Sequence, residues 1–113
     1  MSNARCRIIS AMNGKAITVS RGQRNTKPGH LIIEEYVENK DQMFLIQNII
    51  DNQYTIRSVA DTNKVFDVIN ESTEVYKEII TYDSHLKQNQ KWRIIDMPNQ
   101  NVQIESVHSG LVL

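Results

Sequence analysis

The chain repeats itself at a spacing of 48 residues. Laid on itself at this offset, the sequence aligns three isoleucines, Ile8, Ile56 and Ile104. The other aligned columns are Ser10 with Ser58 and Ser106, Val59 with Val107, Gln42 with Gln90, Phe44 with Trp92, and Ile46 with Ile94. A period shared by this many columns indicates one structural unit built more than once around a common core. The fold must therefore have internal symmetry.

Each unit has the pattern of four short strands. Residues 54–59 and 102–107 alternate apolar and polar side chains with period two, which is typical of half-buried strands. Turn-forming residues follow both segments, and further short apolar runs come after the turns. We predict the remaining strands over residues 16–19, 65–68 and 111–113, about 31–36 and 78–82, and 44–46 and 92–95.

One segment allows a different interpretation. The apolar residues between positions 31 and 50 can also be placed on one face of an amphipathic helix. The equivalent part of the second repeat, residues 78–95, contains the run Ile79-Ile80-Thr81-Tyr82, which favours an extended strand. The repeat therefore argues for strands in both places.

Charge and length exclude several classes of protein. The 113 residues are enough for a single domain, and 13 acidic side chains balance 13 basic ones. No basic cluster favours nucleic acid, and no apolar run reaches the ~18 residues that a membrane-spanning helix needs. The first residues lack the apolar stretch of a secretory signal, so we expect a cytoplasmic protein, with release outside the secretory pathway as the remaining route out of the cell. For the same reason we expect the glycosylation pattern at residues 70–72 to stay unmodified.

No catalytic or metal-binding motif is present. Cys6 is the single cysteine and is expected to be an inert buried thiol on a strand. His30, His85 and His108 lack metal-ligand spacing, and His108 is expected in a turn. The acidic residues near Glu34 are interpreted as a solvated segment rather than a hydrolytic carboxylate pair. We therefore predict no enzyme, no metal and no cofactor.

Repeats of this size occur in β-propellers and β-trefoils, and a propeller needs more blades than this chain can supply. Three sequence elements of the second repeat are informative: Asp67-Val68, Tyr82 and Asn89-Gln90-Lys91-Trp92. A degraded form of the last one, Asp41-Gln42-Met43-Phe44, occurs earlier in the chain. They resemble the ricin B-type β-trefoil lectin family with its Gln-x-Trp motif. The resemblance implies an all-β trefoil in a single domain, residues 1–113, with repeat one at 6–47, repeat two at 54–95 and a partial repeat three at 102–113.

The third repeat is truncated in this sequence. By repeat arithmetic, roughly 30 to 35 residues that would finish it are absent. A barrel lacking two strands exposes apolar edges, which favour pairing with another chain or aggregation. We expect either a fragment of a longer product, which we favour, or strands supplied from elsewhere, for example in a homo-oligomer.

The resemblance places one sugar site in repeat two. Asp67 takes the position of the carboxylate that accepts hydrogen bonds from sugar hydroxyls, and Tyr82 that of the aromatic that stacks on the sugar face. Asn89 would hold a hydroxyl shared with Asp67, Gln90 would support Asp67 from behind, and His85 would add a contact. The alternative roles are structural: a hairpin bond for Asp67, core geometry for Gln90 and barrel packing for Tyr82.

Repeat one departs from the family pattern. Thr18 stands where the carboxylate is expected, Glu34 where the aromatic is expected, and Asp41 where repeat two has asparagine. Tyr36 offers a stacking ring from a shifted position. We predict no functional sugar site here.

The predicted function is that of a lectin or agglutinin that binds glycans of the galactose or N-acetylgalactosamine type, the ligands implied by the resemblance. The competing hypothesis is a trefoil protease inhibitor acting through the exposed loop 21–29, which is rich in turn formers and carries Arg and Lys. A third possibility is the glycan-recognition module of a toxin or an enzyme.

Overall fold

The computed structural model describes residues 4–69, 79–110 and 112–113, and every structural statement below concerns these residues. Three features predicted from the sequence lie wholly or partly outside them. The glycosylation pattern at residues 70–72 is outside, as are the first residue of the predicted strand 78–82 and of the predicted strand 111–113.

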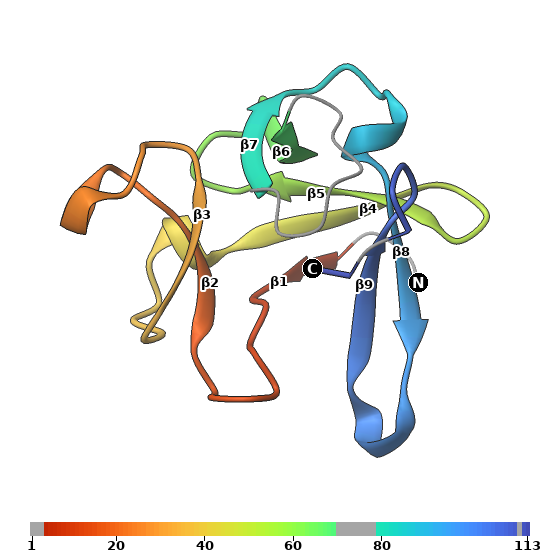
Figure 1. Cartoon of the computed structure of the whole chain (residues 1–113), viewed down its shortest axis with the longest axis horizontal. Helices are drawn as coiled ribbons and strands as arrows, with labels where there is room; N and C mark the ends of the chain where they lie inside the picture. The colour runs from red at the N-terminus through yellow and green to blue at the C-terminus, as the bar shows by residue number, and fades with distance from the viewer. Residues whose placement is uncertain (1–3, 70–78, 111) are drawn as a thin grey trace.

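The described chain is built from strands joined by turns and single 3-10 turns (Figure 1). The strands are β1 (Ala4–Cys6), β2 (Ala16–Val19), β3 (Leu31–Glu34), β4 (Phe44–Ile50), β5 (Gln53–Ser58), β6 (Lys64–Val68), β7 (Ile79–Asp83), β8 (Trp92–Asp96) and β9 (Val102–Ser106). The 3-10 turns are η1 (Gln23–Asn25), η2 (Lys40–Gln42), η4 (Gln88–Gln90) and η5 (Pro98–Gln100).

The strands form two kinds of antiparallel pair. β4 pairs with β5 and β8 pairs with β9, and these long ribbons carry the barrel. β2 pairs with β3 and β6 pairs with β7, forming hairpins at the side of the barrel (Figure 1). β1 continues the barrel by pairing with β4. This is a β-trefoil arrangement, as predicted.

The strand registers repeat with the period of the sequence. Phe44 lies opposite Ser58 in the β4–β5 pair, and Trp92 lies opposite Ser106 in the β8–β9 pair. The repeated serine has a structural task, because its Oγ accepts a backbone N–H from the following turn. These bonds are Met12 N–H to Ser10 Oγ (3.2 Å), Asp61 N–H to Ser58 Oγ (3.2 Å) and Ser109 N–H to Ser106 Oγ (3.2 Å). The aligned columns therefore mark equivalent three-dimensional positions.

The core lies where the two repeats meet. The Phe44 and Phe66 rings pack edge to face with centroids 4.9 Å apart, and the buried Trp92 indole N–H donates to the Phe66 carbonyl (3.3 Å). Phe44 and Trp92 are the aromatic residues of the two Gln-x-aromatic elements. Burial of large aromatic side chains is the main source of stability in a small barrel of this kind.

The helical interpretation of residues 31–50 is wrong. This segment, described in full, contains β3, the single turn η2 and β4. β3 ends at Glu34, two residues before the predicted end of that strand, because the next backbone groups bond elsewhere. The Gln42 side chain accepts the Val37 N–H (2.8 Å) and donates to the Glu35 carbonyl (2.7 Å), which draws the chain away from the sheet.

Cys6 lies on β1, as expected, but it is half-buried rather than fully buried. The reason is that β1 lies at the edge of the described barrel, paired on one side with β4. Burial still raises the pKa of the Cys6 thiol, because the thiolate loses solvation.

Candidate functional site

The carboxylate of Asp67 is the centre of a polar cluster on repeat two. It extends from β6 and is held by two amide side chains of η4. Asn89 Nδ2 donates to Asp67 Oδ1 (3.1 Å), and Gln90 Nε2 donates to Asp67 Oδ2 (2.8 Å). Asp67 is 3% exposed, so its orientation is set by these donors and not by solvent. Hydrogen bonds to a charged acceptor are stronger than neutral ones, which makes this a rigid acceptor group.

Gln90 ties the site to the loop that follows β7. Its Oε1 accepts the backbone N–H of His85 (2.8 Å), and its Nε2 also donates to the Asp83 carbonyl (2.8 Å). The side chain is completely buried. Gln90 therefore positions Asp67 from behind and leaves no group of its own for a ligand.

Asn89 contains an unsatisfied polar atom beside that carboxylate. Its Nδ2 is occupied by Asp67 and by the Val68 carbonyl (3.1 Å), and both partners are acceptors, so the orientation of the amide is determined. Its Oδ1 is buried and has no hydrogen-bond partner among the described residues. A buried acceptor left without a donor costs about 1–3 kcal/mol. A ligand hydroxyl that donates to Oδ1 would remove this cost.

Tyr82 and His85 complete the cluster at its exposed side. Tyr82 lies opposite Val65 in the β6–β7 register, and Val65 and Asp67 share a strand face, so Tyr82 and Asp67 lie on the same face of the hairpin. The Tyr82 ring is 53% exposed. The His85 ring lies between the two, with its centroid 6.4 Å from that of Tyr82 and its Nε2 3.5 Å from Asp67 Oδ2.

A backbone bond fixes the His85 ring. The Lys87 N–H donates to His85 Nδ1 (3.0 Å), so Nδ1 acts as an acceptor and Nε2 carries the proton that faces Asp67. The structure thus brings together all five residues that the sequence selected for this site. Chemically, they combine a fixed carboxylate, an orphaned amide oxygen, an imidazole N–H and an exposed aromatic face.

Repeat one has the same framework and different chemistry. Gln42 makes the bonds of Gln90, to the N–H of Val37 and the carbonyl of Glu35, but its third bond goes to the Thr18 hydroxyl (3.1 Å). Glu34 lies opposite Ala16, the position equivalent to Tyr82 opposite Val65. The register therefore places Glu34 where the aromatic residue would be, as the alignment predicted.

Two arginines neutralise the carboxylates of repeat one, and the sequence analysis missed them. Arg21 Nε donates to Asp41, and the Arg24 guanidinium pairs with Glu34. The hydrogen bond that Arg21 donates to the Asp41 carboxylate raises the pKa of Arg21. The sequence contained a signal for these pairs: Glu34 and Asp41 are acidic where repeat two has Tyr82 and Asn89, and the nearby loop carries two arginines.

The loop 21–29 is largely exposed, as predicted, and Arg21 and Arg24 within it form ion pairs with Asp41 and Glu34. Arg24 and Asn25 both have left-handed backbone conformations, with φ of 51° and 61°, and lie in the turn η1. Tyr36, the alternative stacking residue, is covered by the guanidinium of Arg7, whose Cζ lies 4.4 Å from the ring centroid. Arg24 and Tyr36 are therefore each already in contact with another side chain of the protein.

His108 lies in the turn after β9, as expected. Within residues 4–69, 79–110 and 112–113, histidine, cysteine and carboxylate side chains do not gather in groups of three that could hold a metal ion. Over the same residues, no helix is long and apolar enough to cross a membrane.

Comparison with protein families gives one match. The family model described as ricin-type beta-trefoil lectin domain-like matches residues 40–113, which includes the whole of repeat two and its polar cluster. No sequence among the curated proteins matches this chain.

Several solved structures share the fold. The designed threefold-symmetric protein ThreeFoil superposes with a TM-score of 0.87 at 24% identity, over 96% of this chain and 76% of that one. A lectin from Polyporus squamosus, bound to a human-type influenza-binding epitope, gives 0.86 at 22% identity, over 100% of this chain and 40% of that one. An exo-beta-1,3-galactanase from Clostridium thermocellum gives 0.83 at 23% identity, over 94% and 23%. This chain thus spans less than half of the lectin and of the enzyme.

Proposed function

Because the chain belongs to the ricin-type β-trefoil lectin domain-like family, we propose that it is a carbohydrate-binding module whose sugar site is the polar cluster of repeat two. The observation that carries the proposal is the buried Oδ1 of Asn89, which has no hydrogen-bond partner among the described residues and lies beside the fixed carboxylate of Asp67. Two acceptors side by side suit the hydroxyls of a pyranose ring. The exposed Tyr82 ring suits the apolar C–H face of the same sugar.

We further propose galactose or N-acetylgalactosamine as the sugar. In the family resemblance this ligand type goes with the arrangement of carboxylate, aromatic and asparagine seen in repeat two. Two structural neighbours point the same way by their descriptions, since the epitope on the Polyporus lectin contains a galactose unit and the Clostridium enzyme is a galactanase. At under 25% identity these neighbours support the fold, and the choice of sugar rests on the cluster.

The role proposed is binding without catalysis. Within the described part of repeat two, Asp67 is tied to two amides, and Asp83 forms an exposed ion pair with Lys64 (2.8 Å). Neither is placed as a general acid opposite a second carboxylate. A single site of this kind holds a sugar at about millimolar strength, near −4 kcal/mol, so useful affinity requires several sites on one particle. We expect these from an oligomer or a fusion partner.

The test is calorimetric titration of the intact chain with methyl galactoside and N-acetylgalactosamine, with methyl glucoside as the comparison sugar. We expect one site per chain for the galactose type. Asp67→Ala abolishes binding, because the fixed acceptor is lost, while Thr18→Ala, the equivalent change in repeat one, leaves the affinity unchanged. Thermal melting of each variant checks that it is folded. Equal loss of binding in both variants, or no heat with either sugar at about 10 mM, contradicts the proposal.

The protease-inhibitor hypothesis stays untested and lacks a supporting contact. The loop 21–29 curls into η1 and ties its two arginines to Asp41 and Glu34. An inhibitory loop that enters a protease cleft is recognised as an extended strand. Inhibition of a trypsin-like protease that disappears when residues 21–29 are shortened would restore this hypothesis.

A further inference from the structure

Tyr82 is held in the proposed sugar site mainly through its backbone. Its ring is 53% exposed, so packing alone does not determine where the ring lies. The position of the ring therefore depends on how β7 is held on either side of it. On the C-terminal side, the Asp83 carbonyl accepts a hydrogen bond from Gln90 Nε2 (2.8 Å), which is a contact within repeat two.

On the N-terminal side, Thr81 is bonded to repeat one. The Thr81 N–H donates to the Gly29 carbonyl (2.7 Å), and the Thr81 hydroxyl donates to the same oxygen (2.9 Å). The neighbouring residues, His30 and Ile80, form an antiparallel bridge. A carbonyl oxygen has two lone pairs, so one oxygen can accept both donors. The edge of β7 that faces away from β6 is thus bonded to the loop before β3.

Gly29 is itself held by the hairpin of repeat one. Its N–H donates to the Ser20 carbonyl (2.8 Å), and the Ser20 N–H donates to the His30 carbonyl (2.8 Å). Gly29 has a φ of 84°, a left-handed conformation that glycine adopts without strain. The oxygen to which Thr81 is bonded is therefore fixed by residues of repeat one.

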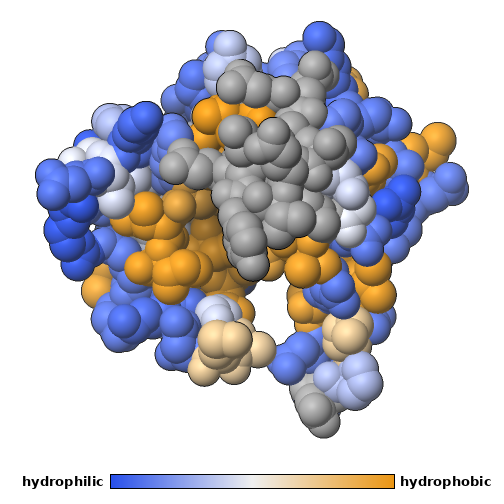
Figure 2. Space-filling view, viewed as in Figure 1, coloured by the Kyte–Doolittle hydropathy of each residue, from blue (hydrophilic) through white to orange (hydrophobic). Residues whose placement is uncertain are grey.

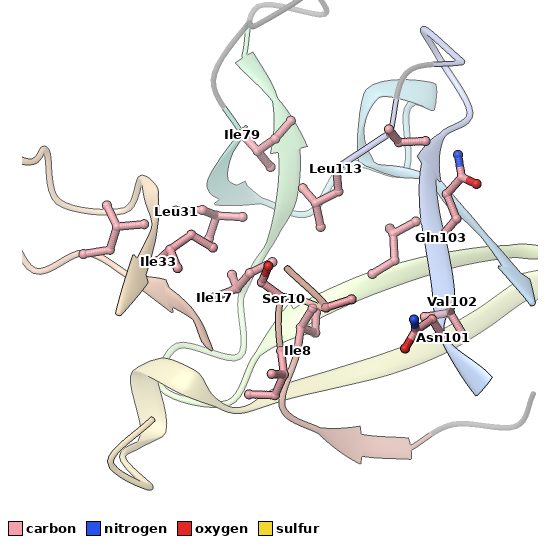
Figure 3. Close-up of a pocket in the computed structure, with 15 residues that line it drawn as sticks. Ile8, Ser10, Ile17, Leu31, Ile33, Ile79, Asn101, Val102, Gln103 and Leu113 are labelled. Atoms are coloured by element: carbon pink, nitrogen blue, oxygen red, sulfur yellow. The ribbon is translucent and has the colours of Figure 1, made fainter. Parts of the chain in front are cut away.

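The two hairpins also meet through apolar side chains. β3 and β7 are in contact, and Leu31 of β3 and Ile79 of β7 pack against the core. Both residues line an apolar cavity of about 500 Å³, together with Ile8, Ile33 and Val102 (Figure 3). Figure 2 shows hydrophobic residues on both sides of this hollow. The bond between Thr81 and Gly29 is thus part of a wider contact between β7 and repeat one.

Repeat one has no hydroxyl at the position of Thr81. In the strand registers Glu34 is equivalent to Tyr82, so Ile33 is equivalent to Thr81. Isoleucine has no hydrogen-bond donor in its side chain. The hydroxyl therefore stands beside the aromatic residue of the proposed sugar site and is replaced by an apolar group in the repeat where we predict no site.

We propose that Thr81 is a positioning residue of the sugar site, and that repeat one fixes the stacking ring of repeat two through the bond between Gly29 and Thr81; this inference rests on the proposed function. A sugar that stacks on Tyr82 while its hydroxyls bond to Asp67 and Asn89 needs the ring and the acceptors at a fixed separation. A ring already held in place loses less freedom when the sugar binds. Thr81 acts through Tyr82 and not on the sugar itself.

The test compares Thr81→Val, which removes the hydroxyl donor, with Thr81→Ser, which keeps it. In NMR titrations with methyl galactoside we expect Thr81→Val to weaken binding about threefold, near the lower end of the cost of immobilising one side chain, and Thr81→Ser to bind like the unaltered chain. Thr62→Val makes the same exchange in the exposed turn between β5 and β6 and leaves the affinity unchanged. Combined with Tyr82→Ala, Thr81→Val should have no further effect, because the ring that it positions is gone.

A second pair of variants acts on the acceptor. Gly29→Ala and Gly14→Ala each place a side chain at a left-handed position, with φ of 84° and 72°, so both should lower the melting temperature. A Cβ at Gly29 would lie 3.5 Å from Thr81 Oγ, whereas a Cβ at Gly14 would meet no described atom within 4 Å. Only Gly29→Ala should weaken sugar binding. Equal affinities of the two variants contradict the inference.

A measurement without sugar separates this inference from the proposed function. The Tyr82 and His85 rings, with centroids 6.4 Å apart, should give NOEs that weaken in Thr81→Val and persist in Thr62→Val. Unchanged NOEs in Thr81→Val, or an equal loss of affinity from Thr81→Val with and without the Tyr82 ring, overturn the inference even where galactoside binds. If the unaltered chain binds no galactoside, the proposed function fails, and the NOEs still decide whether Thr81 positions the ring.

Discussion

Repeats one and two have the same arrangement of strands and differ at three positions of the site proposed in repeat two. Gln42 and Gln90 make matching bonds to the loop after their hairpins. Around this frame, repeat two places Asp67, Tyr82 and Asn89, and repeat one places Thr18, Glu34 and Asp41. The comparison teaches that the glutamine belongs to the fold, whereas the three variable positions give the two repeats different chemistry, and the proposed sugar site rests on those of repeat two.

The two repeats also differ in how the polar side chains at these positions are paired. In repeat two, as far as the structure describes it, the cluster keeps one acceptor without a hydrogen-bond partner, Asn89 Oδ1, and the half-exposed Tyr82. In repeat one, Arg21 and Arg24 from the chain itself bind the two carboxylates. A guanidinium offers N–H donors where a sugar would offer hydroxyls, and in repeat one both carboxylates are already in ion pairs with arginines of the same chain.

The largest expected effect concerns the aromatic residue of the repeated element. Phe44→Ala and Trp92→Ala should each lower the free energy of unfolding by about 3–5 kcal/mol, because both side chains are buried in the shared core. Urea denaturation measures this, with exposed Ile50→Ala as the control. A loss below about 1 kcal/mol in one variant alone would break the equivalence of the two repeats.

The next effect separates the structural role of the two glutamines, Gln42 and Gln90, from the role of Gln90 in the proposed sugar site. Gln42→Ala and Gln90→Ala should each cost about 1–3 kcal/mol of stability, since each leaves buried backbone groups without a partner. Only Gln90→Ala should also weaken galactose binding, because it alone releases Asp67. The measurement combines denaturation with calorimetry. Unequal stability losses would show that the frame is not shared.

A smaller effect tests the exposed ring. Tyr82→Ala should reduce galactose affinity about tenfold, near 1.4 kcal/mol, through loss of the stacking surface. The fold should be unaffected, because the ring is half exposed. Glu34→Ala changes the equivalent position of repeat one and should leave the affinity as it is. If Tyr82→Phe also reduced affinity to that extent, the phenol hydroxyl rather than the ring face would be the contact.

The smallest effect concerns the arginines. Arg21→Ala and Arg24→Ala should alter neither the affinity of repeat two nor, to any large extent, the melting temperature, because both side chains are mostly exposed, at 74% and 72%. The stoichiometry of sugar binding should stay at one per chain. A second site appearing in Arg21→Ala would mean that the loop, not the chemistry of Thr18 and Glu34, closes repeat one.

Much of the fold could be predicted because each repeat confirms the other. The run Ile79-Ile80-Thr81-Tyr82 decided that residues 31–50 are extended, and β3, η2 and β4 confirm it. Strand ends were less predictable. β3 stops at Glu34 because Gln42, eight residues away in the chain, binds the backbone beyond it. Local alternation carries no information about such a contact.

For the site, the resemblance to the ricin B-type family selected Asp67, Tyr82, His85, Asn89 and Gln90, and their roles in sugar binding remain predictions. Their grouping was predictable because register follows from the repeat. The hydrogen-bonding role of each side chain was not predictable. Which amide donates, which oxygen is left unpaired and which nitrogen of His85 carries the proton depend on atoms brought within about 3 Å by separate strands.

The sequence alone indicated the internal repeat and, through the family resemblance, the residues proposed to bind a sugar, because spacing and residue type can be read without coordinates. The tertiary structure alone decided that Arg21 and Arg24 pair with the carboxylates of repeat one, that Asn89 Oδ1 has no hydrogen-bond partner among the described residues, and that Ile8 and Val102 line one apolar cavity. These are relations between residues distant in the chain, and their energies depend on distance and burial, which a linear pattern does not contain.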